Sequence, residues 1–380
     1  YLLDTHVHVG KPCLFVGNPG TAKTTIIQNY LYTQPADKLK RLEINMSSRT
    51  SSFNVQKNIE ANVEKRSGKI FGAPAGKKLA IFIDDMNMPK VDTYGTQQPI
   101  ALLHYLISRD AMYQRGKEVD LLFYRDMRYV AAMGPPGGGR NPVDVRFIAL
   151  FGVINLTNPK EEVLLMIYST ILKQYFEPFT DGVKSIAAKL MDPIIETYNA
   201  CCERLPATPS KFHYVFNIRD VSRVVEGLCL ATPDKIETVD QAVRLLRHEI
   251  VRIFSDRLVD SIDRAVVDGR IEETLSSHFG SQKENALQDP LIFGDFRMAL
   301  ERLQEEEDPR LYEDMGDYKS IRTIFDAVLD EYNIDNKPMS LVLFESALAH
   351  LVRVFRIIRL PRGNAMLVGV GGSGKQSLTK

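Results

Sequence analysis

Short apolar runs alternate with segments of helical periodicity over the first 155 residues or so of the chain. Runs that are apolar throughout are typical of strands buried on both faces of a parallel sheet. Between the first runs, residues 25–31 and 53–64 have helical spacing. This alternation predicts an α/β domain built on a parallel sheet. The predicted strands are residues 13–16, 41–46, 79–83, 128–133 and 147–154.

From about residue 160 the alternation gives way to helical periodicity. Within the segment 239–260, apolar residues recur at helical spacing at Val243, Leu246, Ile250 and Phe254. This change predicts a helical lid domain after the sheet domain. The predicted helices are residues 161–176, 186–203, 218–230 and 239–260.

The last part of the chain predicts the opening of a second α/β module. Residues 304–308 are polar and acidic, and we expect a solvated surface or linker there. Residues 341–358 form a strongly periodic helical pattern that leads into a short apolar run, residues 365–368, with strand character. The expected domains are a large α/β domain over 1–160, a lid over 161–285, and a linker with the start of the next module over 286–380.

Composition narrows the possible functions. A chain of 380 residues with 44% hydrophobic and 25% charged residues has the average balance of soluble globular domains, in two or three domains. Lys plus Arg equals Asp plus Glu at 48 each, so no basic excess points to nucleic acid. No apolar run approaches the roughly 20 residues of a membrane span, and no targeting signal is visible. The four cysteines have neither disulfide nor zinc spacing, so we expect buried free thiols.

A glycine-containing turn follows the run at residues 13–16 and precedes the helical segment 25–31. Strand, turn and helix in this order are the context that a phosphate-binding P-loop requires. The N–H groups of such a turn point at the phosphates, and the helix N-terminus adds positive charge. We expect ATP or ADP to bind here, with Lys23 reaching the β-phosphate and, in ATP, the γ-phosphate, and with Thr24 ligating Mg²⁺. The predicted nucleotide-binding residues are Gly17, Asn18, Pro19, Gly20, Thr21, Ala22, Lys23, Thr24 and Thr25.

Ala22 departs from the P-loop pattern, which has a glycine immediately before the lysine. If this residue has right-handed helical dihedrals, alanine costs nothing and favours the helix. If the position needs a positive φ, the loop is strained. The sequence leaves both alternatives open.

Two adjacent acids end the apolar run at residues 79–83. Asp84 is placed to hold the Mg²⁺ shell, usually through water. Asp85 is placed to polarise the water that attacks the γ-phosphate. Together with the loop at Lys23, these acids predict a nucleoside-triphosphate site.

The N-terminus offers a competing hypothesis. His6 and His8 would lie on one face of a strand, and such a pair can bind zinc in metal-dependent hydrolases. A zinc site would need further ligands at later strand ends, whereas the remaining histidines fall mostly in helical patterns. We therefore favour an ordinary structural role for both histidines.

A second phosphate loop follows residues 365–368 near the end of the chain. It has all the glycines of the pattern, but Gln376 stands at the magnesium hydroxyl position and Ser377 comes one residue late. Phosphate binding is expected here, while the metal geometry stays open. Two such loops imply tandem ATPase modules in a longer polypeptide that continues past Lys380. The predicted binding residues are Gly369, Gly371, Gly372, Ser373, Gly374, Lys375, Gln376 and Ser377.

Both loops and the runs between them resemble the motor ring of dynein heavy chains, from the third AAA+ module into the fourth. The runs that follow Asp84 and Met133 resemble axonemal more than cytoplasmic dyneins. The resemblance extends over nearly the whole chain. It is carried by Phe82-Ile83-Asp84-Asp85-Met86-Asn87-Met88-Pro89, Ala131-Ala132-Met133-Gly134-Pro135-Pro136-Gly137-Gly138-Gly139-Arg140-Asn141, Lys211-Phe212-His213-Tyr214-Val215-Phe216-Asn217-Ile218-Arg219-Asp220 and the second loop.

The resemblance implies further roles for matched positions. Arg219 corresponds to the sensor-2 arginine of the lid, which touches the γ-phosphate. Arg146 resembles an arginine finger that reaches the neighbouring module's nucleotide, although the family continues with Arg-His where this chain has Ala149-Leu150. The position of the polar sensor-1 residue of cytoplasmic members is Gly134 here.

The resemblance also implies partners and a location. The partners are neighbouring AAA+ modules, and, through parts outside this chain, intermediate and light chains and microtubules. The location is the axoneme of cilia or flagella. The leading hypothesis is an AAA+ module that binds ATP with Mg²⁺, hydrolyses it slowly and regulates a microtubule motor. The alternatives are a non-catalytic nucleotide-holding module and an unrelated ring ATPase that remodels proteins.

Overall fold

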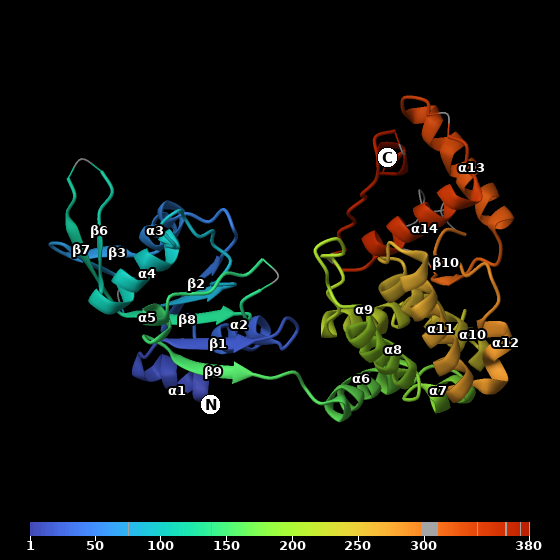
Figure 1. Ribbon diagram of the computed structural model, residues 1–380, viewed down its shortest axis with the longest axis horizontal. Helices are drawn as coiled ribbons and strands as arrows, with labels where there is room; N and C mark the ends of the chain where they lie inside the picture. Colours follow the sequence, from blue (N-terminus) through green and yellow to red (C-terminus); the bar gives the residue numbers. More distant parts are fainter. Residues whose placement is uncertain are drawn as a thin grey trace. The chain divides into compact units, whose positions relative to one another are not determined.

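The computed structural model describes residues 1–74, 76–116, 118–137, 139–297, 311–339, 341–361, 363–372 and 374–379. The chain divides into two compact units, Tyr1–Pro159 and Lys160–Lys380 (Figure 1). The first unit is an α/β layer structure, and the regular structure described in the second is mainly helical. Each unit is described separately below.

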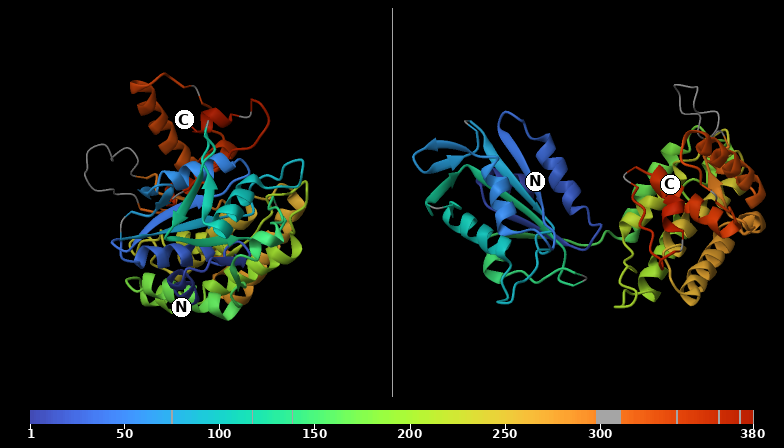
Figure 2. Two further views of the ribbon diagram at one scale, coloured as in Figure 1. Left: turned by 90° about the vertical axis from the view of Figure 1, so that its left-hand side faces the viewer. Right: turned by 90° about the horizontal axis from the view of Figure 1, so that it is seen from above.

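A five-stranded sheet forms the centre of the first unit, and every neighbouring pair of its strands is parallel. The strands lie side by side with helices on both faces (Figure 2). The carboxyl ends of parallel strands meet at one edge, which is where α/β proteins bind ligands. In spatial order, the strands are β2 (Leu39–Asn45), β5 (Lys78–Asp84), β8 (Met127–Met133), β1 (Cys13–Gly17) and β9 (Gly152–Leu156).

Alternate side chains of the central strands enter two separate cores. Phe15, Phe82 and Val130 pack on one face against helices α1 and α2. Leu14 and Ile81 pack on the other face, where α3, α4 and α5 cover the sheet. This burial on both faces explains why the central strands are apolar throughout. The helices are α1 (Leu2–Val9), α2 (Lys23–Thr33), α3 (Ser52–Glu60), α4 (Gln98–Arg109) and α5 (Val145–Ile148).

A second, four-stranded sheet extends the first unit, in the order β3-β4-β7-β6. β4 and β7 are parallel, and the two outer pairs are antiparallel. Tyr124 is fully buried in this region, whereas all four residues of β3 are exposed. The strands are β3 (Glu64–Ser67), β4 (Ile70–Gly72), β6 (Ala111–Tyr113) and β7 (Leu121–Arg125).

Helices α6 to α12 of the second unit share one large apolar core. α9 and α10 each begin with a capping box, formed by Asn217 with Asp220 and by Thr238 with Gln241. Such reciprocal caps satisfy backbone N–H groups at both helix starts. The elements are α6 (Glu161–Tyr175), α7 (Asp181–Ile186), α8 (Met191–Arg204), α9 (Ile218–Leu228), α10 (Val239–Ile250), the π-helical turn η1 (Val251–Ser255), α11 (Ser261–His278), η2 (Gly280–Gln282) and α12 (Lys283–Ala286).

A smaller core lies beside the large one in the second unit. Ile292 and Phe296 flank a short antiparallel strand pair and pack with Ile321, Leu348 and Val352. The last helix of the unit carries the second phosphate lysine at its start. The elements are β10 (Phe293–Gly294), β11 (Glu313–Asp314), α13 (Tyr318–Asp335), α14 (Glu345–Arg359) and α15 (Lys375–Thr379).

One predicted strand is displaced along the chain, and another does not form. Residues 147–154 divide into the end of α5, a turn and the start of β9. Asp144 caps α5 by accepting a hydrogen bond from the N–H of Arg146, and Phe147 is fully buried against Phe151. Residues 365–368 form no strand, because a strand needs a partner for its backbone groups and the described part of the second unit pairs only β10 with β11.

Other expectations need smaller corrections. The helix predicted over 53–64 ends at Glu60, and the one predicted over 186–203 begins only at Met191, as α8, because α7 ends at Ile186 and a turn follows it. The acidic stretch 304–308 lies outside the described residues. Of the cysteines, Cys202 is exposed, so the expectation of buried thiols fails there. Burial raises the pKa of the Cys13 thiol from 9.0 to about 11, which keeps it neutral. No helix in the described ranges is long and apolar enough to cross a membrane.

Candidate nucleotide-binding site

The first phosphate loop connects β1 to α2 at the carboxyl edge of the sheet. Gly17 fits tightly, since a Cβ there would lie 2.3 Å from the carbonyl oxygen of Leu156. Lys23 Nζ donates to the carbonyl oxygens of Gly17 and Asn18, at 2.7 Å each, and lies 3.3 Å from Thr21 Oγ1. The lysine side chain thus folds back onto its own loop, and its ammonium group lies near the N-terminus of α2.

Ala22 adopts a left-handed conformation, with φ 59° and ψ 19°. Of the two alternatives that the sequence left open, the strained one is therefore present. A non-glycine residue in this region costs roughly 1–2 kcal/mol because Cβ crowds the following carbonyl oxygen. Backbone strain of this size is typical of functional loops whose surroundings hold them in place.

Thr24 and Asp84 come together across the carboxyl edge of the sheet. The Thr24 hydroxyl, at the start of α2, donates to Asp84 Oδ2 at the end of β5, over 2.7 Å. Hydroxyl and carboxylate oxygens are the hard ligands that Mg²⁺ prefers, usually one or two from the protein with phosphates and water completing the shell. Within the described residues no cluster of three or more His, Cys, Asp or Glu could hold a metal ion. The oxygen donors of Thr24 and Asp84 are of the kind that Mg²⁺ takes from a protein when phosphates supply other ligands.

Asp85 follows in an unusual backbone conformation. Its φ is 49°, and its N–H donates to Asp84 Oδ1 over 2.9 Å. The carboxylate is 52% exposed, and Arg140 approaches it with 3.9 Å between Nη2 and Oδ1. The left-handed turn thus directs Asp85 away from the buried strand, beside a guanidinium.

Two further polar residues, Asn87 and Arg140, lie at this edge of the sheet, and their motifs alone predict no role for them. Asn87 is buried, and its amide donates to the carbonyl oxygen of Gly134 over 2.8 Å. Arg140 lies against Gly134 in the loop that follows β8. The signal that could have found them is the recurrence of polar residues after two central strands, because those strand ends meet at one edge.

The arginines assigned by resemblance are both exposed. Arg146 lies in α5, and no hydrogen bond or ion pair among the described residues joins its side chain to Asp84 or Asp85. Arg219 stands in the first turn of α9, in the second unit, where its N–H donates to the Asn217 side chain over 2.9 Å. Their roles toward a nucleotide stay predictions.

The second loop repeats the lysine contacts of the first. Lys375 Nζ donates to the carbonyl oxygens of Gly369 and Val370, at 2.8 and 2.7 Å. Gly371, Gly372 and Gly374 form the turn, and Ser373 lies outside the described residues. Gln376 and Ser377 follow in α15, where Gln376 is exposed.

The zinc hypothesis for the N-terminus is wrong. His6 and His8 lie in helix α1, not in a strand, and residues two apart point to different sides of a helix. His6 packs on the backbone at Gly152, where an added Cβ would lie 2.2 Å from its ring. A structural role accounts for this contact.

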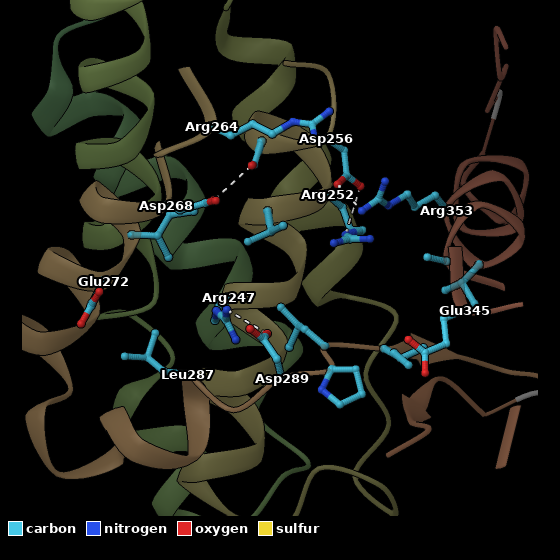
Figure 3. A pocket seen from close by; sticks show the side chains of 18 of the residues that line it. Arg247, Arg252, Asp256, Arg264, Asp268, Glu272, Leu287, Asp289, Glu345 and Arg353 are labelled. Atoms are coloured by element: carbon cyan, nitrogen blue, oxygen red, sulfur yellow. Dashed lines mark hydrogen bonds and ion pairs between the residues drawn. The ribbon is translucent and has the colours of Figure 1, made fainter. Parts of the chain in front are cut away.

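A cavity of about 1050 Å³ in the second unit is lined by charges, but they pair within the chain (Figure 3). Arg252 and Arg353 both approach Asp256, at 3.2 and 3.4 Å. Arg247 pairs with Asp289 at 3.1 Å. Because these guanidiniums already have carboxylate partners, the first phosphate loop remains the better candidate for a nucleotide.

The parallel sheet, the phosphate loop on β1, the acids on β5 and the helical unit define a P-loop protein of the AAA+ class. Three family models match the chain. A P-loop containing dynein motor region matches residues 1–159, a dynein heavy chain ATPase lid domain matches residues 167–264, and a P-loop containing dynein motor region D4 matches residues 339–380.

Curated relatives align with the whole chain. It is 48% identical over 380 residues to dynein axonemal heavy chain 10 of Homo sapiens. Identity is 49% over 385 residues to the dynein-1-alpha heavy chain of the flagellar inner arm I1 complex of Chlamydomonas reinhardtii, and 39% over 384 residues to human dynein axonemal heavy chain 2. The chain spans 8% of the length of each of these relatives. It belongs to the dynein heavy chain family, and the alternative of an unrelated ring ATPase is wrong.

Proposed function

We propose that the first phosphate loop binds ATP with Mg²⁺ and hydrolyses it slowly, as a regulatory module of a microtubule-based motor. In this proposal residues 1–160 are the large domain of the third AAA+ module, 161–285 its lid, and 286–380 a linker with the start of the fourth. The neighbouring modules are the direct partners. Intermediate and light chains and microtubules act through other parts of a dynein, and the relatives' names suggest an axonemal location.

The contact between Thr24 and Asp84 carries this proposal. A hydroxyl from the phosphate loop and a carboxylate from a neighbouring strand lie 2.7 Å apart, although 60 positions separate them in the sequence. An ordinary surface hydrogen bond can join any two polar side chains. This one joins the residue after the phosphate-loop lysine to the end of a buried strand. With Mg²⁺ bound, the ion supplies charge neutralisation at the phosphates, and Thr24 and Asp84 are the side chains that would hold it.

Lys23 is the proposed phosphate ligand. Its two loop carbonyl partners hold the ammonium at the turn, whose N–H groups we expect to point at a bound phosphate. An arriving phosphate offers a charged acceptor in place of neutral carbonyls, and charge-assisted hydrogen bonds are the stronger ones. Lys23 would then have hydrogen-bond acceptors both with and without a bound nucleotide.

Asp85 is the proposed general base, and its geometry supports slow turnover. Many AAA+ proteins have glutamate here, whose carboxylate extends one methylene further. General-base help contributes about 10²–10⁴-fold when the base is within hydrogen-bond reach of the water, and a misplacement of about 1 Å can cost 100-fold. The exposed Asp85 carboxylate beside Arg140 also suits the alternative of a site that holds nucleotide without hydrolysing it.

Single-turnover hydrolysis at this site separates the two possibilities. The experiment uses a complete dynein motor that carries this segment, with every other phosphate-loop lysine replaced by alanine. Wild type, Asp85→Glu and Asp85→Asn are mixed with radiolabelled ATP, and phosphate release is followed. The proposal expects Glu to match or exceed wild type and Asn to be slower than wild type. An Asn variant as fast as wild type would show that Asp85 is not the base, and undetectable wild-type turnover would favour the nucleotide-holding alternative.

A further inference from the structure

Arg140 stands in a loop that the backbone fixes on both sides. Its N–H and carbonyl oxygen exchange hydrogen bonds with Gly137, at 3.1 and 3.0 Å. The next residue, Asn141, donates from its backbone to Asn87 and from its amide to Pro89, both over 2.9 Å. The loop after β8 is thereby tied to the segment after β5, which carries Asp84 and Asp85.

The guanidinium of Arg140 fills the space beside Gly134. A Cβ at Gly134 would lie 2.8 Å from Arg140 Nε, 3.0 Å from Cδ and 3.2 Å from Cζ. A side chain at residue 134 and the present position of Arg140 are therefore mutually exclusive. Asn87 holds the Gly134 carbonyl, so the glycine itself stays in place.

The same guanidinium faces the proposed catalytic edge. Its Nη2 lies 3.9 Å from Asp85 Oδ1, and its Nε is buried with no hydrogen-bond partner in the described part of the chain. A buried donor without a partner needs an explanation, such as an ordered water, a strained contact or a catalytic role. Stability does not account for the pair, since half-exposed ion pairs contribute little to it.

We propose that Arg140 is a positioning residue for Asp85: it occupies the space that Gly134 leaves and holds the Asp85 carboxylate at the strand end. This inference rests on the proposed function, in which Asp85 is the general base. A left-handed aspartate with a half-exposed carboxylate has several accessible rotamers. A fixed positive charge on one side selects the rotamers that point toward it, which restricts where the base can stand.

Three variants test the role of Arg140 in the single-turnover assay described above. Arg140→Met keeps most of the length but removes the charge, and we expect hydrolysis to slow about 10-fold or more, because small misplacements of a catalytic group have effects of this order. Arg140→Lys keeps the charge and should recover part of the rate. Gly134→Ala removes no charge but displaces the guanidinium, and it should slow hydrolysis as Arg140→Met does. ATP affinity, measured separately, should change less than about twofold in all three.

A double-mutant cycle and a control complete the test. Gly134→Ala should add nothing in an Arg140→Met background, because both changes act on the same side chain. Arg66→Met is the matched control, since it removes a part-exposed arginine that pairs with Asp126 in the same unit. Its hydrolysis rate should equal that of wild type.

The outcomes separate this inference from the proposed function. If Asp85→Asn slows hydrolysis but Arg140→Met and Gly134→Ala do not, the inference is wrong and the proposed base stands. If Arg140→Met loses ATP affinity or thermal stability as much as it loses rate, its role is structural and the inference is equally wrong. If Asp85→Asn has no effect, the proposed function fails first. Gly134→Ala decides the question even where an Arg140 variant does not fold.

Discussion

The two phosphate loops of this chain share two positive φ values and the contacts of their lysines but differ in what surrounds them. Three residues before the lysine, Gly20 and Gly372 have φ of 89° and 78°. One residue before it, Ala22 and Gly374 have φ of 59° and 75°. In both loops the lysine donates to the carbonyl oxygens five and six residues earlier. A phosphate cradle is thus a local property, set by a short run of sequence.

The surroundings of the loops differ because they depend on distant residues. The first loop follows β1, which lies between β8 and β9, and Thr24 meets Asp84. The second loop follows a segment without strand structure, in which Met366 and Val368 are each 84% exposed. Within the described residues, only the first loop therefore has a carboxylate in contact with the residue that follows its lysine. The loop contacts of the lysine thus form without a sheet, whereas the contact between Thr24 and Asp84 depends on a neighbouring strand.

Replacing Lys23 should have the largest effect on this comparison. Lys23→Ala removes a charge-assisted contact worth roughly 1.5–3 kcal/mol, which is about 10- to 150-fold in ATP affinity. Photo-crosslinking of azido-ATP in a complete dynein motor, mapped to the peptide that contains the first loop, measures occupancy of that site. Lys375→Ala is the matched control and should leave the first loop's occupancy unchanged. Equal affinity of Lys23→Ala and wild type would remove the basis for a phosphate site here.

Mild acid should destabilise the unit that carries the second loop before the unit that carries the first. His248 is fully buried, and burial together with the nearby Arg252 and Arg356 lowers its pKa well below 6.5. Below about pH 6.5 the unfolded chain takes up a proton that the folded chain refuses, so stability falls by about 1.4 kcal/mol per pH unit until the folded pKa is reached. Above that range the effect is absent.

Thermal unfolding of wild type and His248→Leu between pH 5 and 7.5 measures this effect. The variant cannot titrate, so its unfolding temperature should depend less on pH than that of wild type. Hydrogen exchange at each pH assigns the loss to a unit. Identical pH profiles for the two proteins would contradict the role of His248.

Relieving the left-handed strain at Ala22 should have a smaller effect. Ala22→Gly removes a penalty of roughly 1–2 kcal/mol but adds about 0.5–1 kcal/mol of unfolded-state entropy, so we expect a net gain in unfolding free energy of about 0 to 1.5 kcal/mol. Gly374→Ala introduces the same strain in the second loop and should destabilise it. Thermal unfolding measures both, and a loss of stability on Ala22→Gly would mean that the Cβ makes contacts that outweigh the strain.

Changing Gln376 should have the smallest effect, confined to magnesium. The Gln amide oxygen is a possible ligand on a longer and more flexible stem than a threonine hydroxyl. In a dynein motor with a complete second module, Gln376→Thr should shift the magnesium concentration needed for ATP binding at the second loop by a few-fold, without changing binding at the first. Superimposable magnesium titrations would contradict an altered metal geometry.

The sequence predicts the three central strands of the sheet well because these strands are buried on both faces. The apolar runs that became β1, β5 and β8 need no information beyond themselves. β3 was missed because its four residues are all exposed, so it has no apolar pattern to recognise. Residues 365–368 are predicted as a strand from their apolar run, but they have no partner strand among the described residues and therefore do not form a strand.

The site could be predicted in its parts but not in its geometry. The sequence places Lys23, Thr24 and Asp84 in recognisable motifs, and parallel strand ends bring them to one edge. It leaves the conformation of Ala22 open and gives no reason for Asp85 to be left-handed. The approach of Arg140 to Asp85 depends on the space at Gly134 and on two loops packing together, and local sequence contains neither.

The magnesium dependence of ATP binding at the first loop tests the central claim that Thr24 and Asp84 form a metal site. Asp84→Asn keeps the shape of the side chain but removes its charge, and changes next to a metal typically weaken its binding by 10- to 100-fold. We therefore expect the variant to need about 10- to 100-fold more Mg²⁺ for half-maximal azido-ATP labelling of this loop. Asp120→Asn, which alters a part-exposed aspartate paired with Lys69 in the same unit, should titrate like wild type. If Asp84→Asn and wild type give the same magnesium curve, the contact between Thr24 and Asp84 is not a metal site and the account of the first loop is wrong.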